Sequence, residues 1–186
     1  MLKWILIVVG ALIVLVLVLW IVGTALPREH VATSRARFEQ PADAVWAGIT
    51  DHASMTAWRS GMQKTERGAD QDGKPVWIET SSFGEMPLRV EEAFPPKRYA
   101  VAIASEGLPF GGRWTYEIEP SDGGCQLSIT ENGFVKPALF RVMTRFLFGY
   151  HATMDQYLKD LAKRFGASVE PEHPSGSESR LQAVRF

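Results

Sequence analysis

The sequence predicts a two-layer α+β domain that follows a long apolar helix at the start of the chain. Three observations support this fold class. Residues 4–26 carry no charge, segments of alternating polar and apolar residues fill the middle of the chain, and residues 137–165 place apolar side chains at helical spacing. Consecutive strands favour an antiparallel sheet, and a sheet with one apolar face packs against an amphipathic helix to give two layers.

The composition is that of one globular domain of ordinary size with an additional apolar segment. Of the 186 residues, 46% are hydrophobic, and the net charge is −1. This balance, together with the lack of a basic cluster among aromatic residues, argues against nucleic-acid binding. The one cysteine, Cys125, excludes an intramolecular disulfide and a site built from several cysteines.

Residues 1–26 are predicted to form one transmembrane anchor. The uncharged run has the length of a bilayer-spanning helix, about 20 residues, and carries Trp4 and Trp20 near its ends, where membrane interfaces favour tryptophan. A cleaved signal peptide is the alternative, because residues 23–25 are small. The apolar run is longer than the core of a usual signal peptide, and Pro27 fits poorly beside a cleavage site.

Residues 27–30 are predicted to form a short juxtamembrane linker, which would hold the following domain close to the lipid. The chain is therefore expected to cross a membrane once. In a bacterium this membrane would be the inner membrane. The side on which the domain lies stays open. Lys3 in a very short tail is set against three arginines after the helix, which gives the positive-inside rule little to compare.

Two short helices are expected between the first strand and the rest of the sheet. Alternating apolar and polar residues predict a strand over residues 31–38. Pro41 suits the first turn of a helix, where its missing N–H costs nothing. Asp51 offers a capping side chain for a second short helix that ends near Trp58.

Six further strands are expected after these helices, separated by turn residues. They are predicted at residues 62–67, 75–83, 86–92, 99–105, 112–119 and 125–132.

The strongest hairpin signal is the sequence Ser-Asp-Gly-Gly at residues 121–124. A turn there pairs Trp114 with Glu131 and Tyr116 with Ile129. The hairpin therefore places these four side chains on one face of the sheet.

Residues 137–165 are predicted to form one long amphipathic helix whose apolar face the sheet covers. The apolar face consists of Leu139, Val142, Met143, Phe146, Tyr150, Met154, Tyr157 and Leu161. The last segment, residues 166–186, is rich in Pro, Ser, Glu and Gly and is predicted to be a disordered tail.

The sequence PADAVW at residues 41–46, ITD at 49–51 and Trp58 precede the strands and the C-terminal helix. In this arrangement residues 31–165 resemble the SRPBCC superfamily, which includes the START and birch-pollen-allergen-like proteins, and in particular its polyketide cyclase/dehydrase-like branch. The resemblance implies a helix-grip fold, in which a curved antiparallel sheet wraps around a long C-terminal helix. It also implies a deep cavity between them for a hydrophobic ligand. An N-terminal anchor is not part of the family pattern.

Glu131 is the best candidate for a catalytic residue, because it shares a face with Ile129 and Trp114. In a cavity its carboxyl group would have a raised pKa and could bind a ligand hydroxyl or act as an acid or base. The alternative is a hydrated glutamate at the mouth of the cavity.

Arg59 beside Trp58 is a candidate for binding an anionic or carbonyl head group at the rim of the pocket. The alternative is that Trp58 is a core or lid residue and Arg59 a solvated helix cap. The other predicted ligand-binding residues follow from the strands and the helix that would line the cavity. They are Trp114, Tyr116, Glu131, Phe146, Tyr150, Met154 and Tyr157.

No metal site and no cofactor are predicted. His52 and His151 lack the three or four convergent donors that a metal ion needs. The sequence shows no Ser-His-Asp order, phosphate-binding loop or nucleophile elbow. Phe148 lies among polar positions of the helix, and one hypothesis is that this end of the helix contacts lipid or a partner.

Three functions are compatible with the sequence. The leading hypothesis is a membrane-anchored domain that binds a hydrophobic or amphipathic small molecule, or a lipid, between sheet and helix. The second is an enzyme of the cyclase, aromatase or dehydratase type, which would need Glu131, Tyr116 and Tyr150 to converge in the same cavity. The third is a non-catalytic partner-binding domain with a collapsed cavity. The sequence identifies neither the ligand nor the oligomeric state.

Overall fold

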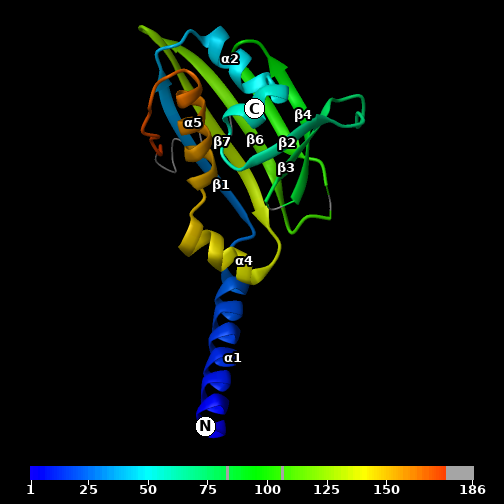
Figure 1. Cartoon of the computed structure of the whole chain (residues 1–186), viewed down its shortest axis with the longest axis vertical. Helices are drawn as coiled ribbons and strands as arrows, with labels where there is room; N and C mark the ends of the chain where they lie inside the picture. Colours follow the sequence, from blue (N-terminus) through cyan, green and yellow to red (C-terminus); the bar gives the residue numbers. More distant parts are fainter. Residues whose placement is uncertain (83, 106, 175–186) are drawn as a thin grey trace.

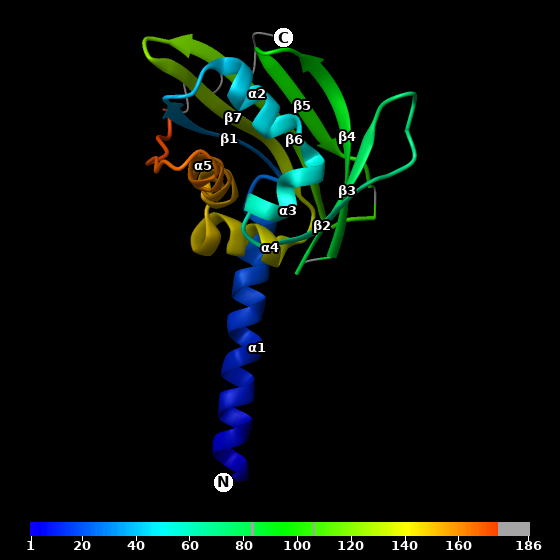
Figure 2. The same ribbon diagram turned by 45° about the horizontal axis from the view of Figure 1, so that its top comes forward.

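The computed structural model of the chain describes residues 1–82, 84–105 and 107–174. A curved sheet carries helices on its concave side and stands on a long N-terminal helix, as Figure 1 and Figure 2 show. The strands are β1 Glu29–Phe38, β2 Met62–Arg67, β3 Val76–Ser81, β4 Gly84–Phe94, β5 Arg98–Ile103, β6 Phe110–Ser121 and β7 Gly124–Val135. The helices are α1 Leu2–Ala25, α2 Ala42–Thr50, η1 His52–Ser54, α3 Met55–Trp58, α4 Ala138–Met143, η2 Thr144–Phe148 and α5 Ala152–Arg164.

The described strands form one antiparallel sheet in the order β1-β7-β6-β5-β4-β3-β2. The predicted fold class, an α+β helix-grip fold with a curved sheet around a C-terminal helix, is confirmed. The hairpin between β6 and β7 has the predicted register, with Trp114 opposite Glu131 and Tyr116 opposite Ile129. Gly123 closes its turn with a φ of +76°, which an L side chain rarely adopts.

Alternation along the strands puts one set of side chains on the concave face, where α5 covers it. Met154, Leu158 and Leu161 of α5 are fully buried against this face. Phe38 and Leu127 on β1 and β7 are buried with them. Removal of this apolar area from water is the main force that holds helix and sheet together.

The helix predicted over residues 137–165 is two helices in the structure. After α4 the chain forms one π-type turn, η2, and then leaves the helical conformation at Gly149, whose φ is +74°. With a ψ of +163° as well, Gly149 has a backbone conformation that is open almost only to glycine, because glycine has no Cβ. The helical spacing of apolar residues continues across Gly149, so the pattern gave no sign of the break. Phe146 consequently lies outside the core and is 64% exposed.

Helix α4 lies across the C-terminal end of α1. The contact is close at Gly23, where an added Cβ would lie 2.2 Å from the carbonyl oxygen of Ala138. The buried side chain of Arg141 donates a hydrogen bond of 3.1 Å from Nη1 to the carbonyl oxygen of Leu26, one of the carbonyl groups left without a partner at the end of a helix. By length and composition, α1 is able to span a membrane.

Two segment boundaries differ from the sequence-based prediction. Strand β1 begins at Glu29, within the residues expected to form the linker. Residues 166–174, the first part of the predicted disordered tail, return along β1, where the backbones of Arg35 and Glu172 exchange two hydrogen bonds. The remaining part of that predicted tail, residues 175–186, lies outside the described residues.

Replacement of Met154 by alanine is expected to lower the free energy of unfolding by about 2–5 kcal/mol, because a fully buried side chain leaves a cavity between α5 and the sheet. Met143→Ala is the matched control, because Met143 is exposed on α4. It should change the stability by less than about 0.5 kcal/mol. Urea unfolding of the full chain in detergent, followed by tryptophan fluorescence, measures both. Equal losses would contradict the packing described for α5.

Candidate functional site

The concave face of the sheet buries an ion pair between the helical insertion and strand β3. Arg59 follows α3 directly, and its Nη1 donates to Oε1 of Glu79 at 2.6 Å. The two side chains are 16% and 4% exposed. The guanidinium carbon also lies 5.0 Å from the ring centre of Tyr157 on α5, so residues from three elements meet at this point.

The ion pair is unusual because its surroundings are aromatic. Burial raises the pKa of Glu79, and the Arg59 guanidinium opposes that shift. Desolvation of two charges costs more than an average ion pair returns in stability, so a buried pair is weak evidence for a structural role. A carboxyl group with a perturbed pKa beside a specific partner is a feature of functional sites.

Four aromatic side chains enclose the pair on the concave face. Neighbouring rings of Trp58, Trp114, Tyr116 and Tyr157 lie with their centres 5.3–6.1 Å apart. Burial raises the pKa of Tyr116 and of Tyr157, so both phenols stay protonated at neutral pH. The buried hydroxyl of Tyr157 has the Tyr116 side chain as a hydrogen-bonding neighbour. This hydroxyl is a polar group able to contact a ligand.

His52 is a second buried polar group at this site. Its ring stacks on Trp77 with centres 4.8 Å apart, and its Nε2 lies 2.6 Å from the hydroxyl of Tyr99. Burial, with the nearby charge of Arg59, lowers the pKa of His52 to about 4. The imidazole is therefore neutral at physiological pH.

Asp160 of α5 fixes the chain beside Arg59. Its carboxylate accepts hydrogen bonds from the backbone N–H of Ser60 at 2.7 Å and from the Ser60 hydroxyl at 2.9 Å. Asp160 is buried, so these bonds are shielded from water. The direct link between α5 and the residue after Arg59 holds the guanidinium over Tyr157.

The concave face is not closed over its whole length. Large apolar side chains on β3 to β6 remain partly exposed, namely Trp77, Met86, Ile103 and Trp114. Met86 and Ile103 lie toward the end of the sheet where β6 begins, which is also where β7 leads into α4. These partly exposed side chains are therefore on the side of the domain nearest to α1.

Glu131 lies on the predicted face but belongs to a different cluster from Arg59. Its Oε1 is 3.2 Å from Nε2 of His30, and the His30 ring stacks on Tyr150 with centres 4.1 Å apart. The Glu131 side chain is 24% exposed. The structure thus brings Tyr116 and Tyr157 together but leaves Glu131 and Tyr150 in this second cluster.

A serine, two histidines and an aspartate also meet beside the second cluster. The Ser34 hydroxyl donates to Oδ1 of Asp155 at 2.7 Å and lies 3.2 Å from Nδ1 of His151. His173 contacts the same carboxylate through Nε2 at 3.0 Å, and its ring stacks on His151. Burial, with the nearby His173, lowers the pKa of His151. In a nucleophile triad the histidine stands between serine and aspartate, whereas here the serine contacts both, so this arrangement is not a triad.

The predicted ligand-binding residues therefore separate into groups. Five lie together at the ion pair or in its aromatic wall: Trp58, Arg59, Trp114, Tyr116 and Tyr157. Glu131 and Tyr150 form part of the second cluster, Met154 is a fully buried core residue, and Phe146 is exposed.

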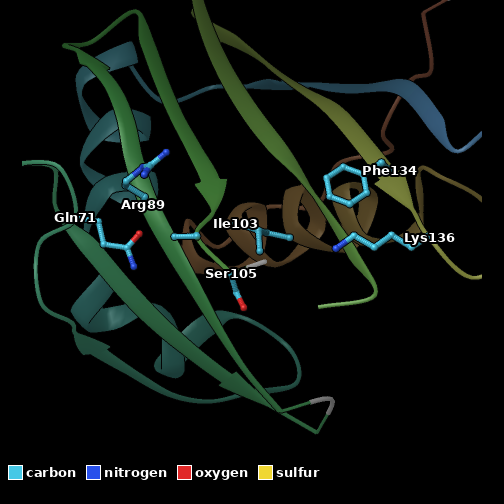
Figure 3. A pocket seen from close by; sticks show the side chains of 7 residues that line it. Gln71, Arg89, Ile103, Ser105, Phe134 and Lys136 are labelled. Atoms are coloured by element: carbon cyan, nitrogen blue, oxygen red, sulfur yellow. The ribbon is translucent and has the colours of Figure 1, made fainter. Parts of the chain in front are cut away.

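A cavity of about 530 Å³ lies mainly on the convex side of the sheet, although one of its lining residues, Ile103, shares the concave face of Leu88. It is an open groove lined by Gln71, Arg89, Ile103, Ala104, Ser105, Phe134 and Lys136, most of which Figure 3 labels. Arg89 alternates with the core residue Leu88, and Phe134 lies three positions from the inward-facing Glu131, so both point to the convex face. Arg89 is held there by Glu91 and Asp72.

The arrangement of elements and the sequence agree with one protein family. A family model described as polyketide cyclase / dehydrase and lipid transport matches residues 29–166. The chain belongs to this family. The family match confirms the resemblance to the polyketide cyclase-like branch of the SRPBCC superfamily. No curated protein matches the chain at a significant level.

Solved structures share the fold of this polyketide cyclase-like domain at low sequence identity. A conserved protein from Geobacillus kaustophilus is 17% identical with a TM-score of 0.61, covering 77% of this chain and all of its own. A protein from Thermobifida fusca is 18% identical with a TM-score of 0.56, and the match covers 73% of this chain and 93% of that one. The di-domain ARO/CYC protein StfQ of the steffimycin biosynthetic pathway is 11% identical with a TM-score of 0.57, over 75% of this chain and 53% of StfQ.

Sequence reasoning missed the partners of Arg59. Glu79 has no clear signal, because Val76 and Ile78 form the more apolar phase of β3 and would place Glu79 on the polar face. His52 and Asp160 have no clear signal either. Their role depends on helices from distant parts of the sequence meeting over the sheet.

The stability of the protein is expected to fall as the pH drops from about 6.5 to about 4. The folded protein binds a proton at His52 only near pH 4, whereas the unfolded chain binds it near 6.5, so acid favours unfolding. The contribution of this one group is about 3 kcal/mol between pH 7 and pH 4. Thermal unfolding of the wild type and of His52→Gln over this range isolates it, because the variant should lose less stability in acid. Parallel pH profiles would contradict a neutral buried His52.

Proposed function

We propose that this chain is a membrane-anchored domain that binds a hydrophobic or amphipathic small molecule between the concave face of the sheet and α5. The buried pair of Arg59 and Glu79 is the observation that carries the proposal. Arg59 would recognise an anionic or carbonyl group of the ligand, and the aromatic wall around it would contact the apolar part. Membership of a family that includes lipid transport proteins supports the same conclusion.

The guanidinium of Arg59 has donors left for a ligand oxygen. Among the described residues, its hydrogen bonds are to Glu79 and to the Met55 sulfur, and both use Nη1. A guanidinium carries five N–H donors. The Tyr157 hydroxyl and Arg59 lie on the same side of the aromatic wall, which gives a ligand head group one charged and one neutral donor.

Anchoring by α1 would place the domain where hydrophobic ligands concentrate. Helix α1 has 24 residues with Lys3 as its one charged residue, and the rest of the domain leaves its most apolar part uncovered. A helix of this length measures about 36 Å, enough to cross a hydrocarbon core of about 30 Å. The partly exposed side chains of Met86 and Ile103 lie at the same end of the domain as α1, so a ligand could reach them from the membrane surface.

A cyclase- or dehydratase-type enzyme is the second candidate, and one observation favours it. Glu79, with its raised pKa, lies in the same site as Arg59 and the protonated phenol of Tyr157. A carboxyl group of this kind suits proton transfer to or from a bound carbonyl compound. In this version of the hypothesis Glu79 replaces Glu131 as the catalytic candidate.

A partner-binding domain without a ligand is the third candidate, because the aromatic rings around Arg59 already pack closely on one another. Native mass spectrometry of the full chain released from detergent micelles distinguishes the candidates. A retained small molecule supports the ligand-binding proposal, and its chemical conversion on the protein supports the enzyme. Absence of any bound molecule supports the third candidate.

Arg59→Lys is expected to weaken binding of the co-purifying ligand by roughly 10- to 100-fold. Lysine keeps the positive charge opposite Glu79 but loses the planar set of donors, and a hydrogen bond to a charged group is worth about 1.5–3 kcal/mol. Arg89→Lys in the outer groove is the matched control and should bind as the wild type does. Titration of the delipidated full chain by intrinsic tryptophan fluorescence measures both variants.

The opposite pattern would overturn the proposed site. If Arg89→Lys weakened binding and Arg59→Lys did not, the ligand would occupy the groove on the convex face.

A further inference from the structure

Among the described residues, α4 and η2 carry the largest group of exposed large apolar side chains outside α1. We infer that this surface, the α4–η2 patch, lies in the headgroup layer of the membrane and forms a second contact with lipid beside the anchor. The patch consists of Leu139, Phe140, Met143, Phe146, Leu147 and Phe148. The inference rests on the anchoring by α1 proposed above and adds a lipid-binding surface to the globular domain.

The number of exposed aromatic side chains in the patch needs an explanation. Phe146, Leu147 and Phe148 are consecutive and are 64%, 73% and 62% exposed. Single exposed apolar residues are ordinary on soluble proteins, but contiguous groups of large ones mark contact surfaces. Gly149 ends the helical segment directly after them, so these three side chains occupy the last turn before α5 turns back to the sheet.

The position of the patch relative to α1 identifies lipid as its partner. The close contact between Gly23 and Ala138 and the hydrogen bond from Arg141 to Leu26 hold α4 at the end of α1. Because Leu139 follows Ala138 directly, the patch begins beside the C-terminal end of α1. A protein partner for the patch would have to enter the same lipid layer.

The depth of α4 follows from the tryptophans of α1. Trp4 and Trp20 lie near the two ends of the helix, and tryptophan side chains prefer the level of the lipid headgroups. Gly23 follows Trp20 by three residues, which is about 4.5 Å along a helix axis. Helix α4 contacts α1 at that level, so it lies in the interfacial layer rather than in water above it.

The composition of the segment fits an interfacial helix. Such helices bury phenylalanine and leucine at the boundary of headgroups and acyl chains and direct basic residues to the lipid phosphates. Arg145 is exposed within η2, and Arg28 is exposed just after α1. Both guanidinium groups are close enough to the expected phosphate level to favour anionic lipid.

A fluorescent probe at Phe148 tests the inference in the full chain. Phe148→Cys is labelled with an environment-sensitive fluorophore, and the protein is reconstituted into nanodiscs of phosphatidylcholine and phosphatidylglycerol with a nitroxide near the headgroup end of the acyl chain. We expect the nitroxide lipid to remove most of the fluorescence of this probe. Leu147→Cys provides a second position in case one substitution disturbs folding. Cys125 is fully buried, and unlabelled wild-type protein confirms that it does not react.

Phe94→Cys is the matched control. Phe94 is 61% exposed, almost the same as Phe148, but it ends β4 opposite Arg98, at the end of the sheet away from α4. Its probe should lose almost no fluorescence. A third probe, Val14→Cys in the middle of α1, tests the anchoring separately. Its fluorescence should be quenched by a lipid that carries its nitroxide deep in the acyl chain.

Each pattern of quenching decides the question. Quenching at Val14 and at Phe148 or Leu147, without quenching at Phe94, supports the inference. Quenching at Val14 without quenching at either patch position overturns the inference but supports the anchoring by α1. A disulfide-linked dimer of Phe148→Cys would then show that a second copy of the chain binds the patch. No quenching at Val14 overturns the anchoring and the inference with it.

Discussion

The concave face of the curved sheet is covered by two groups of helices, because one helix of thirteen residues is too short to cover it alone. Helix α5 covers the part over β1, while α2 and α3 lie over β6, β7 and β2. The buried side chains of Met154 and Leu158 show how tightly α5 is bound. The candidate site lies where these two groups of helices meet, at the contact between Arg59 after α3 and Tyr157 on α5.

The polar groups inside the domain lie where α5 meets the other helices, α2 and α3. Arg59 leaves the end of α3, Glu79 comes from the sheet, and Tyr157 comes from α5. Each group reaches the site only because the packing of apolar residues elsewhere holds its element in place. The hydrogen bonds from Ser60 to Asp160 tie α3 to α5 directly. The packing of the apolar core residues therefore fixes the positions of the buried polar groups.

The second cluster and the group around Asp155 beside it join the strand that follows α1 to α5 and to the C-terminal segment. His30 on β1 contacts Glu131, while His173 and Ser34 contact Asp155 on α5. The segment after α5 would otherwise leave the domain at this point. These contacts bring the two ends of the globular domain to one edge of the sheet, and that edge begins two residues after Pro27. The C-terminal end of α1 and strand β1 are thus joined by a short connection.

The sequence by itself determined the long apolar N-terminal helix, the order of strands and helices, and the register that puts Trp114 opposite Glu131. These features depend on local periodicity and turn residues, which act over a few positions. The break at Gly149 and the pairing of Arg59 with Glu79 were decided only by the tertiary structure. A glycine within a helical pattern is compatible with a continuous helix until packing directs the chain elsewhere. Two charged residues 20 positions apart become partners only when the sheet curves and a helix closes over it.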